Sequence, residues 1–279
     1  MVMPSPGEAS GETETPLCFM CCRPASLQCP GCEDVWFCCP THGTVHHRPH
    51  LSSCFPWRVE TLPGKGRVMV TTRDVLAGET LFMEEPIVHG PNQGSPICLT
   101  CYSTVSLDYL CEECGYPMCD SDCARDPVHK AECEILARGE RPTFQEGETE
   151  AYHCILPLRL ILLARQDPDR FSFADHLMDH EEERAGSEDW LTTERTVVER
   201  LVVNCQAGHY EGISRAEVRR AVGVLEVNCY EVYSFIIKSD SVSGGLRGCY
   251  PAASLLSHSC IANSRHVWGT SPPYYVTQG

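Results

Sequence analysis

The chain has 279 residues, of which 42% are hydrophobic and 22% are charged, so it is long enough for two or three compact domains. Acidic residues outnumber basic ones by 38 to 22, and the resulting formal charge of −16 repels phosphate backbones, so direct nucleic-acid binding is not expected. We also expect no signal peptide and no membrane span, because the N-terminus is polar and acidic and the most apolar run, residues 155–163, contains Pro157 and Arg159.

Residues 1–17 are rich in Glu, Thr, Ser, Gly and Pro, and we expect them to be disordered. Residues 18–54 then form the first of two clusters of cysteine and histidine. The whole chain holds 20 Cys and 12 His, many of them in close pairs. Because no secretory segment is expected, paired cysteines indicate metal coordination rather than disulfides. The sequence therefore predicts a zinc protein.

The first cluster contains four pairs of candidate zinc ligands: Cys18 and Cys21, Cys29 and Cys32, Cys38 and His42, and His50 and Cys54. A tetrahedral zinc ion takes four nitrogen or sulfur ligands, so eight candidates predict two ions. A gap of three residues places two ligands on one helix face, so the last two pairs predict helices. His46 and His47 are alternatives to His50 as the seventh ligand.

Residues 58–92 have a different character. A Gly-rich turn at residues 63–66 leads into the apolar run 67–70, and residues 74–78 offer a second turn before Leu81, Phe82 and Met83. Apolar runs separated by such turns predict a β-hairpin.

Residues 98–133 form the second cluster, and its ligand order is similar to that of the first. Its four pairs are Cys98 and Cys101, Cys111 and Cys114, Cys119 and Cys123, and His129 and Cys133. These ligands predict two further ions, which gives about four zinc ions per chain. A finger this small depends on metal binding for its folding free energy, so we expect metal removal to unfold both fingers.

The rest of the chain alternates helical and irregular patterns. Residues 134–203 have apolar side chains three and four apart and predict a mostly helical segment. Within it, the acidic stretch 175–189 is expected to be a solvated face or loop. Residues 213–279 predict a helix over 216–228, an aromatic-rich segment over 230–237 and a compact motif at 254–263.

Both cysteine clusters resemble the MYND zinc finger. In that family the first and third ligand pairs bind one zinc ion, and the second and fourth pairs bind the other. The resemblance implies the same pairing here, whereas spacing alone leaves the pairing open. MYND fingers dock short Pro-containing peptides, which implies a protein partner for this chain.

Three further segments, Gly64 to Pro86, Gly223 to Val232 and Tyr250 to Asn263, resemble the SET domain of the SET and MYND (SMYD) protein-lysine methyltransferase family. The additional N-terminal finger is similar to the arthropod branch of that family. The resemblance implies an α+β fold, in which a β-rich SET domain is interrupted by a MYND zinc finger and a helical insert. It also implies lysine methylation of a histone or another protein.

The same resemblance implies contacts to S-adenosylmethionine from eight residues: Gly64, Lys65, Gly66, Arg67, Asn228, Ser254, Ser257 and His258. Ser257 stands where the family has asparagine. Loss of that amide costs about 1–3 kcal/mol if its partners remain buried and unpaired.

The family pattern continues past Asn263 with a strand, a catalytic tyrosine and a post-SET group of cysteines that Cys260 would join. Tyr274 and Tyr275 lie too close to Ser257 to be that tyrosine. We therefore expect a SET domain truncated before these elements, no catalytic residue within the chain and little or no activity. The alternative is a non-catalytic, zinc-dependent adaptor or transcriptional repressor. A monomer in the cytoplasm, the nucleus or both is expected.

Overall fold

The computed structural model describes residues 16, 18, 23–29, 36–40, 56–92, 96–144, 150–232, 245–267 and 274–277. The chain divides into two compact units, Met1–Cys54 and Phe55–Gly279. In the first unit, β1 (Leu27–Gln28) pairs antiparallel with β2 (Trp36–Phe37), and Cys18 bridges to Trp36 in parallel.

The second unit begins with the predicted hairpin, formed by β3 (Trp57–Leu62) and β4 (Gly66–Thr71). Gly64 and Gly66 have φ angles of +73° and +71°, which a glycine adopts without steric cost. The strand after the second turn, β5 (Thr80–Met83), pairs with β10 (Tyr274–Thr277) and not with the hairpin.

Two three-stranded antiparallel sheets follow in this unit. One has the order β5-β10-β9, where β9 is Ser264–Val267. The other has the order β6-β8-β7, formed by β6 (Val88–Pro91), β8 (Leu246–Cys249) and β7 (Cys229–Glu231). Segments more than 130 residues apart in sequence therefore share a sheet.

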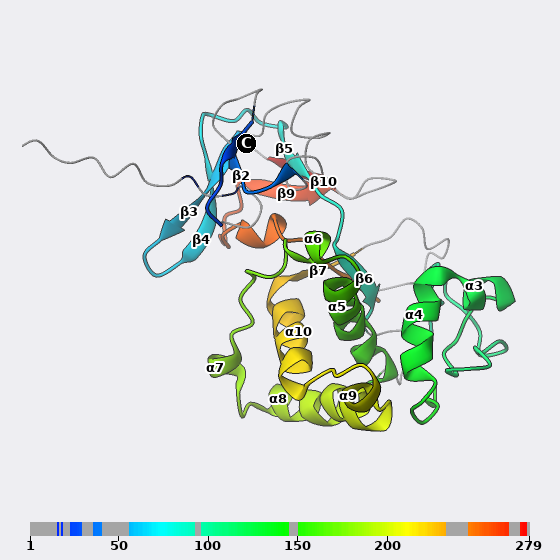
Figure 1. The fold of residues 1–279 in the computed structure, drawn as a ribbon. Coiled ribbons are helices and arrows are strands. Elements are labelled where there is room, and N and C mark those ends of the chain that lie inside the picture. Colours follow the sequence, from blue (N-terminus) through cyan, green and yellow to red (C-terminus); the bar gives the residue numbers. More distant parts are fainter. Residues whose placement is uncertain are drawn as a thin grey trace, which may run out of the picture. The chain divides into compact units, whose positions relative to one another are not determined.

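The described segments between β6 and β7 are mainly helical, as predicted (Figure 1). In chain order the helices are α3 (Ser121–Arg125), α4 (Pro127–Leu136), η1 (Glu150–Cys154), α5 (Ile155–Gln166), α6 (Pro168–Phe171), α7 (Glu181–Arg184), α8 (Glu188–Thr193), the π-helices η2 (Glu194–Val198) and η3 (Arg200–Asn204), α9 (Ala207–Tyr210) and α10 (Arg215–Asn228). A short 3₁₀ helix, η4 (Ala253–Leu255), follows β8. The chain thus has the expected mixture of helix and strand.

Helix α10 begins at Arg215, one residue before the predicted start. The Ser214 hydroxyl accepts a bond from the Glu217 amide at 3.1 Å, and the Glu217 carboxylate accepts one from the Ser214 amide at 2.8 Å. This capping box satisfies two amides that have no partner within the helix. The buried face of α10 packs on α5, whose Ile155, Leu158 and Ile161 are buried (Figure 1). The core of this unit lies between these two helices and β6.

Helix α5 contains Pro157, which is tolerated because it lies in the first turn of the helix. None of the helices in the described part of the chain has the length and apolar content needed to cross a bilayer.

The acidic stretch 175–189 is only partly solvated. Glu181, Glu182 and Glu183 on α7 are exposed, as predicted. The preceding residues are held in place, because the His176 and Met178 carbonyls accept bonds from Arg67 and Asn228. The prediction of a solvated face or loop therefore fails only at Leu177, which is buried; residues 176–178 lie outside any helix or strand and Met178 is exposed.

Candidate metal centres and cofactor site

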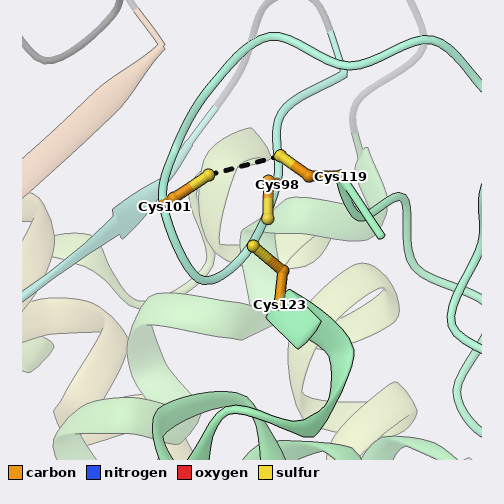
Figure 2. A group of neighbouring side chains, drawn as sticks. All are labelled: Cys98, Cys101, Cys119 and Cys123. Atoms are coloured by element: carbon orange, nitrogen blue, oxygen red, sulfur yellow. Dashed lines mark hydrogen bonds between the residues drawn. The ribbon is translucent and has the colours of Figure 1, made fainter. Parts of the chain in front are cut away.

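The second cluster of cysteine and histidine forms two separate groups of four ligands. One contains Cys98, Cys101, Cys119 and Cys123, whose sulfur atoms converge in Figure 2. The other contains Cys111, Cys114, His129 and Cys133. Within each group all ligand atoms lie within 4.8 Å of one another. The first pair thus meets the third and the second meets the fourth, which is the interleaving that the family resemblance implies.

The spacing of these atoms fits tetrahedral zinc. Bonds of about 2.3 Å to sulfur and about 2.0–2.1 Å to nitrogen place two sulfur ligands about 3.8 Å apart, and sulfur and nitrogen about 3.6 Å apart. The sulfurs of Cys111 and Cys133 are 3.6 Å apart, and Cys114 Sγ lies 3.6 Å from His129 Nε2. In the other group, the sulfurs of Cys101 and Cys119 are 3.3 Å apart. Both groups could therefore bind zinc.

Two turns of the same geometry present the first ligand of each group. The amides of Cys98 and Cys111 donate to the carbonyl five residues later, at 2.9 and 2.8 Å. Their carbonyls accept from the amide four residues later, at 3.0 and 2.9 Å. That fourth residue has a positive φ, +60° at Tyr102 and +79° at Gly115. The left-handed residue reverses the chain and directs both thiols of each pair towards one point.

Helices α3 and α4 supply the remaining ligands, and His129 and Cys133 lie one turn apart on α4, as predicted. The helical prediction is only half right for the third pair, because α3 begins at Ser121 and Cys119 precedes it. Asp120 sets this start, since its carboxylate accepts bonds from the amides of Asp122 and Cys123 at 2.9 and 3.0 Å.

A buried ion pair supports the group that contains His129. Glu132 is buried and lies 3.4 Å from His129 Nδ1, so its carboxylate can orient the imidazole. Arg159 of α5 donates to both oxygens of Glu132, at 2.6 and 2.7 Å. Burial opposes the charge of Glu132, but Arg159 and His129 hold the pKa of Glu132 below its usual value.

Arg159 also contacts the turn that carries Cys98 and Cys101. Its guanidinium donates to the Tyr102 hydroxyl at 2.7 Å and to the Leu99 carbonyl at 2.8 Å. It further donates to the His89 carbonyl of β6 at 2.9 Å. Sequence reasoning missed both Glu132 and Arg159. Ligand spacing gives no signal for Arg159, which lies on another helix, and it does not distinguish Glu132 on α4 from the other acids near the ligands.

The predicted ligands of the first finger are described only in part. Cys18 and Cys29 are buried and Cys38 is half-buried. Five predicted ligands lie outside the described residues: Cys21, Cys32, His42, His50 and Cys54. The ligand set of this finger therefore stays a prediction.

Three of the predicted cofactor residues come together in the second unit. The Arg67 guanidinium donates to the His176 carbonyl, and the Asn228 amide donates to the Met178 carbonyl at 2.9 Å. The Ser254 hydroxyl donates to the Asn228 carbonyl at 3.1 Å. Arg67 of β4 and Asn228 of α10 thus both bond residues 176–178, and Ser254 of η4 bonds Asn228.

The other predicted cofactor residues lie apart from this contact. Gly64, Lys65 and Gly66 form the exposed turn of the β3–β4 hairpin. Ser257 and His258 follow η4 and are exposed, and His258 Nε2 lies 3.7 Å from the sulfur of Cys260. Among the described residues, no hydrogen bond joins the hairpin turn or the segment after η4 to Arg67, Asn228 or Ser254.

A buried carboxylate that sequence reasoning missed positions η4. Both oxygens of Glu84 accept bonds at the start of this helix, from the Ala252 amide at 2.7 Å and the Ala253 amide at 3.0 Å. Burial raises the pKa of Glu84 to about 7, although these two bonds favour the charged form. Glu84 is followed by a second glutamate, Glu85, and the sequence alone does not indicate which of the two side chains is buried.

Comparison with known proteins identifies three relatives. The chain is 26% identical over 237 residues to the SET domain-containing protein SmydA-8, isoform A, of Drosophila melanogaster, which covers 76% of this chain and 45% of the relative. Isoform B is also 26% identical, over 235 residues, or 78% of this chain and 48% of the relative. The histone-lysine N-methyltransferase ASHR1 of Arabidopsis thaliana is 22% identical over 218 residues, or 74% and 43%. The chain therefore spans about half the length of the curated relatives it matches. No protein-family model matches it.

Proposed function

We propose that this chain, a homologue of SMYD-like SET domain proteins, forms the zinc-binding and cofactor-binding part of an S-adenosylmethionine-dependent protein-lysine methyltransferase. The methyl acceptor would be a lysine of a histone or of another protein. The observation that carries the proposal is the meeting of Arg67, Asn228 and Ser254, which come from three segments that each resemble the SET domain.

The residues at this contact fit a small polar ligand. The Asn228 side chain is oriented by two carbonyls, those of Met178 at 2.9 Å and Val224 at 2.8 Å. Its position is therefore set before a ligand arrives, which lowers the entropic cost of binding. Gly64 and Gly66 lie apart from this contact, in the exposed hairpin turn. No atom lies within 4 Å of the position that a Cβ would occupy at either glycine, so a ligand can approach the backbone closely there. When bound, S-adenosylmethionine would supply the methyl group.

The zinc ions would have a structural role. Each group of the second finger provides four protein ligands, which leaves no coordination position for a substrate or a reactive water. The Arg159 network would then join the zinc-bound finger to α5 and β6, the framework on which the cofactor residues are built.

A second candidate function is protein docking by the second finger, and the surface of the finger favours it. Five exposed acids lie on it, Asp108, Glu112, Glu113, Asp120 and Asp122, and Asp126 is half-buried beside them. Exposed apolar side chains accompany them, with 40% of Leu110 and 59% of Val128 accessible. An acidic surface with apolar anchors suits a basic peptide that contains proline. An adaptor or transcriptional repressor would need only this surface.

Calorimetric titration with S-adenosylhomocysteine tests the cofactor site. We expect the zinc-loaded chain to bind one equivalent with micromolar affinity. Asn228→Ala should weaken binding at least about tenfold, the effect of losing roughly one charge-neutral hydrogen bond in a buried site. Asn204→Ala is the matched control, because Asn204 is exposed at the end of η3.

Zinc content and circular dichroism of each variant would show that the fold is retained. Absence of binding to the folded, zinc-loaded chain would contradict the cofactor site. Equal binding by the wild type and Asn228→Ala would contradict the role given to Asn228. Docking by the finger would then remain as the function that the described surface supports.

A further inference from the structure

Two cysteines outside the zinc-ligand groups face each other across a strand pair. The register of β7 and β8 places Cys229 directly opposite Cys249. The Val232 amide donates to the Leu246 carbonyl at 2.9 Å, and hydrogen-bonded and non-hydrogen-bonded pairs alternate along an antiparallel ladder. The Cys229–Cys249 pair, three positions along, is therefore of the non-hydrogen-bonded type.

This type of pair suits a disulfide. Its Cα atoms lie about 4.5 Å apart and its side chains project from the same face of the sheet. Disulfides span Cα separations of about 4.4–6.8 Å, so a bond can form here without moving the strands.

The two thiols differ in their access to solvent. Cys249 is fully buried, whereas Cys229 is half-buried. The hydrogen bond to Cys229 and burial both raise the pKa of Cys249 well above its usual value. Cys249 therefore keeps its proton until its neighbour has reacted, and Cys229 is the sulfur that an oxidant from solvent reaches first.

We propose that Cys229 and Cys249 form a reversible thiol–disulfide site that reacts with hydroperoxides. The sulfur of Cys229 attacks one oxygen of hydrogen peroxide, the O–O bond breaks, and a sulfenic acid and one water result. The sulfur of Cys249 then displaces the hydroxyl group from the sulfur of Cys229 and a second water leaves. Two electrons from the two thiols thus reduce one peroxide to two waters.

The location of the pair gives the modification a consequence. Cys229 directly follows Asn228, whose carbonyl accepts a bond from Ser254. The next residue, Tyr230, donates from its hydroxyl to the Ala253 carbonyl at 2.8 Å. A disulfide would therefore fasten β7 to β8 beside the contact between α10 and η4. The reaction itself depends only on the two cysteines, so it can be tested whether or not the chain binds S-adenosylmethionine.

Mapping of disulfides in the zinc-loaded full chain tests the proposal. The chain would be exposed to increasing hydrogen peroxide, alkylated with iodoacetamide, digested and examined by mass spectrometry, with zinc release followed in parallel. We expect a linked peptide pair containing Cys229 and Cys249 to appear while zinc remains bound, and dithiothreitol to restore both thiols.

Two variants sharpen this experiment. In Cys249→Ser, the sulfenic acid on Cys229 should persist and be trapped by dimedone. Cys205→Ser is the matched control, because Cys205 is also fully buried but lies on no strand, and it should leave the linked pair unchanged. Free Cys229 and Cys249 at peroxide levels that already release zinc would overturn the proposal. A link from Cys229 to a different cysteine would overturn it as well.

Discussion

At the residue scale, Arg159 connects three separate parts of the second unit. Its guanidinium bonds Glu132 beside one group of zinc ligands, Tyr102 beside the other and β6 through His89. Only 10% of the Arg159 side chain and 1% of the Glu132 side chain is accessible. Each charge is therefore stabilised by the other. If one were removed, water could not reach the remaining charge to solvate it.

Arg159→Met should accordingly destabilise the chain by about 3–5 kcal/mol, since it leaves the Glu132 charge buried and unpaired. It should also speed transfer of zinc to a chelator, because the orientation of His129 through Glu132 is lost. Urea unfolding and a colorimetric chelator measure the two effects.

Arg165→Met provides the control on the same helix. Arg165 pairs with Glu217, and 33% and 45% of these side chains are accessible, so the variant should lose less than about 1 kcal/mol. Equal losses of stability in the two variants would show that the Arg159 network adds nothing beyond a surface ion pair.

Glu84 makes stability depend on pH. Its pKa is raised from 4.5 to about 7, so the fold favours the neutral form. Between pH 4.5 and about 7 the carboxyl ionises in the unfolded chain but stays neutral in the folded one. The free energy of unfolding is therefore highest below pH 4.5 and falls by roughly 3 kcal/mol as the pH rises to about 7. Urea unfolding between pH 5.5 and pH 7.5 should therefore show a steeper decline for the wild type than for Glu84→Gln. Glu85→Gln, at the exposed neighbouring position, should follow the wild type. Parallel curves for all three proteins would refute the shift.

At the element scale, the two zinc-binding turns share one backbone geometry and differ at the left-handed residue. Gly115 adopts its positive φ without cost, whereas Tyr102 is held there by burial and by its bond to Arg159. The turn at Cys111 therefore depends on the backbone freedom of glycine, and the turn at Cys98 depends on tertiary contacts.

Gly115→Ala should cost about 1–2 kcal/mol, because an L-residue is strained in the left-handed conformation. The new Cβ would also lie 3.2 Å from Arg141 side-chain atoms. Gly212→Ala is the matched control, with a φ of +65° and no atom near the added Cβ. Both variants should lose stability in urea, but only Gly115→Ala should lose zinc faster to a chelator. Equal rates of zinc loss would contradict a role for this turn in holding the metal.

The sequence predicted those elements whose signals are local. Spacing identified the ligands of the second finger and the helix carrying His129 and Cys133, and the apolar pattern predicted α10 to within one residue of its start. It did not predict that Cys119 precedes α3. The four-residue spacing from Cys119 to Cys123 indicates one helix, but Asp120 caps the helix and makes it begin after Cys119. Non-local contacts were also missed. The bonds from Arg159 to Glu132, from Glu84 to η4 and from β5 to β10 join segments that no sequence period connects.

At the scale of the whole molecule, both groups of candidate zinc ligands and the proposed cofactor contact are assembled from distant segments. Residues 98–101 meet 119–123. Arg67 of β4 and Asn228 of α10 bond residues 176–178, and Ser254 of η4 bonds Asn228. The zinc ions would fix the finger, whose small apolar core cannot hold it alone. We therefore infer that the first and third ligand pairs of the second finger hold one zinc ion, and that the second and fourth pairs hold another.

Measuring the zinc content of two double variants tests this pairing of the ligands. Cys101→Ser with Cys119→Ser removes two ligands from one group, whereas Cys101→Ser with Cys114→Ser removes one ligand from each group. Relative to the wild type, we expect a loss of about one zinc ion per chain in the first variant and about two in the second. A loss of two zinc ions in the first variant and only one in the second would contradict it.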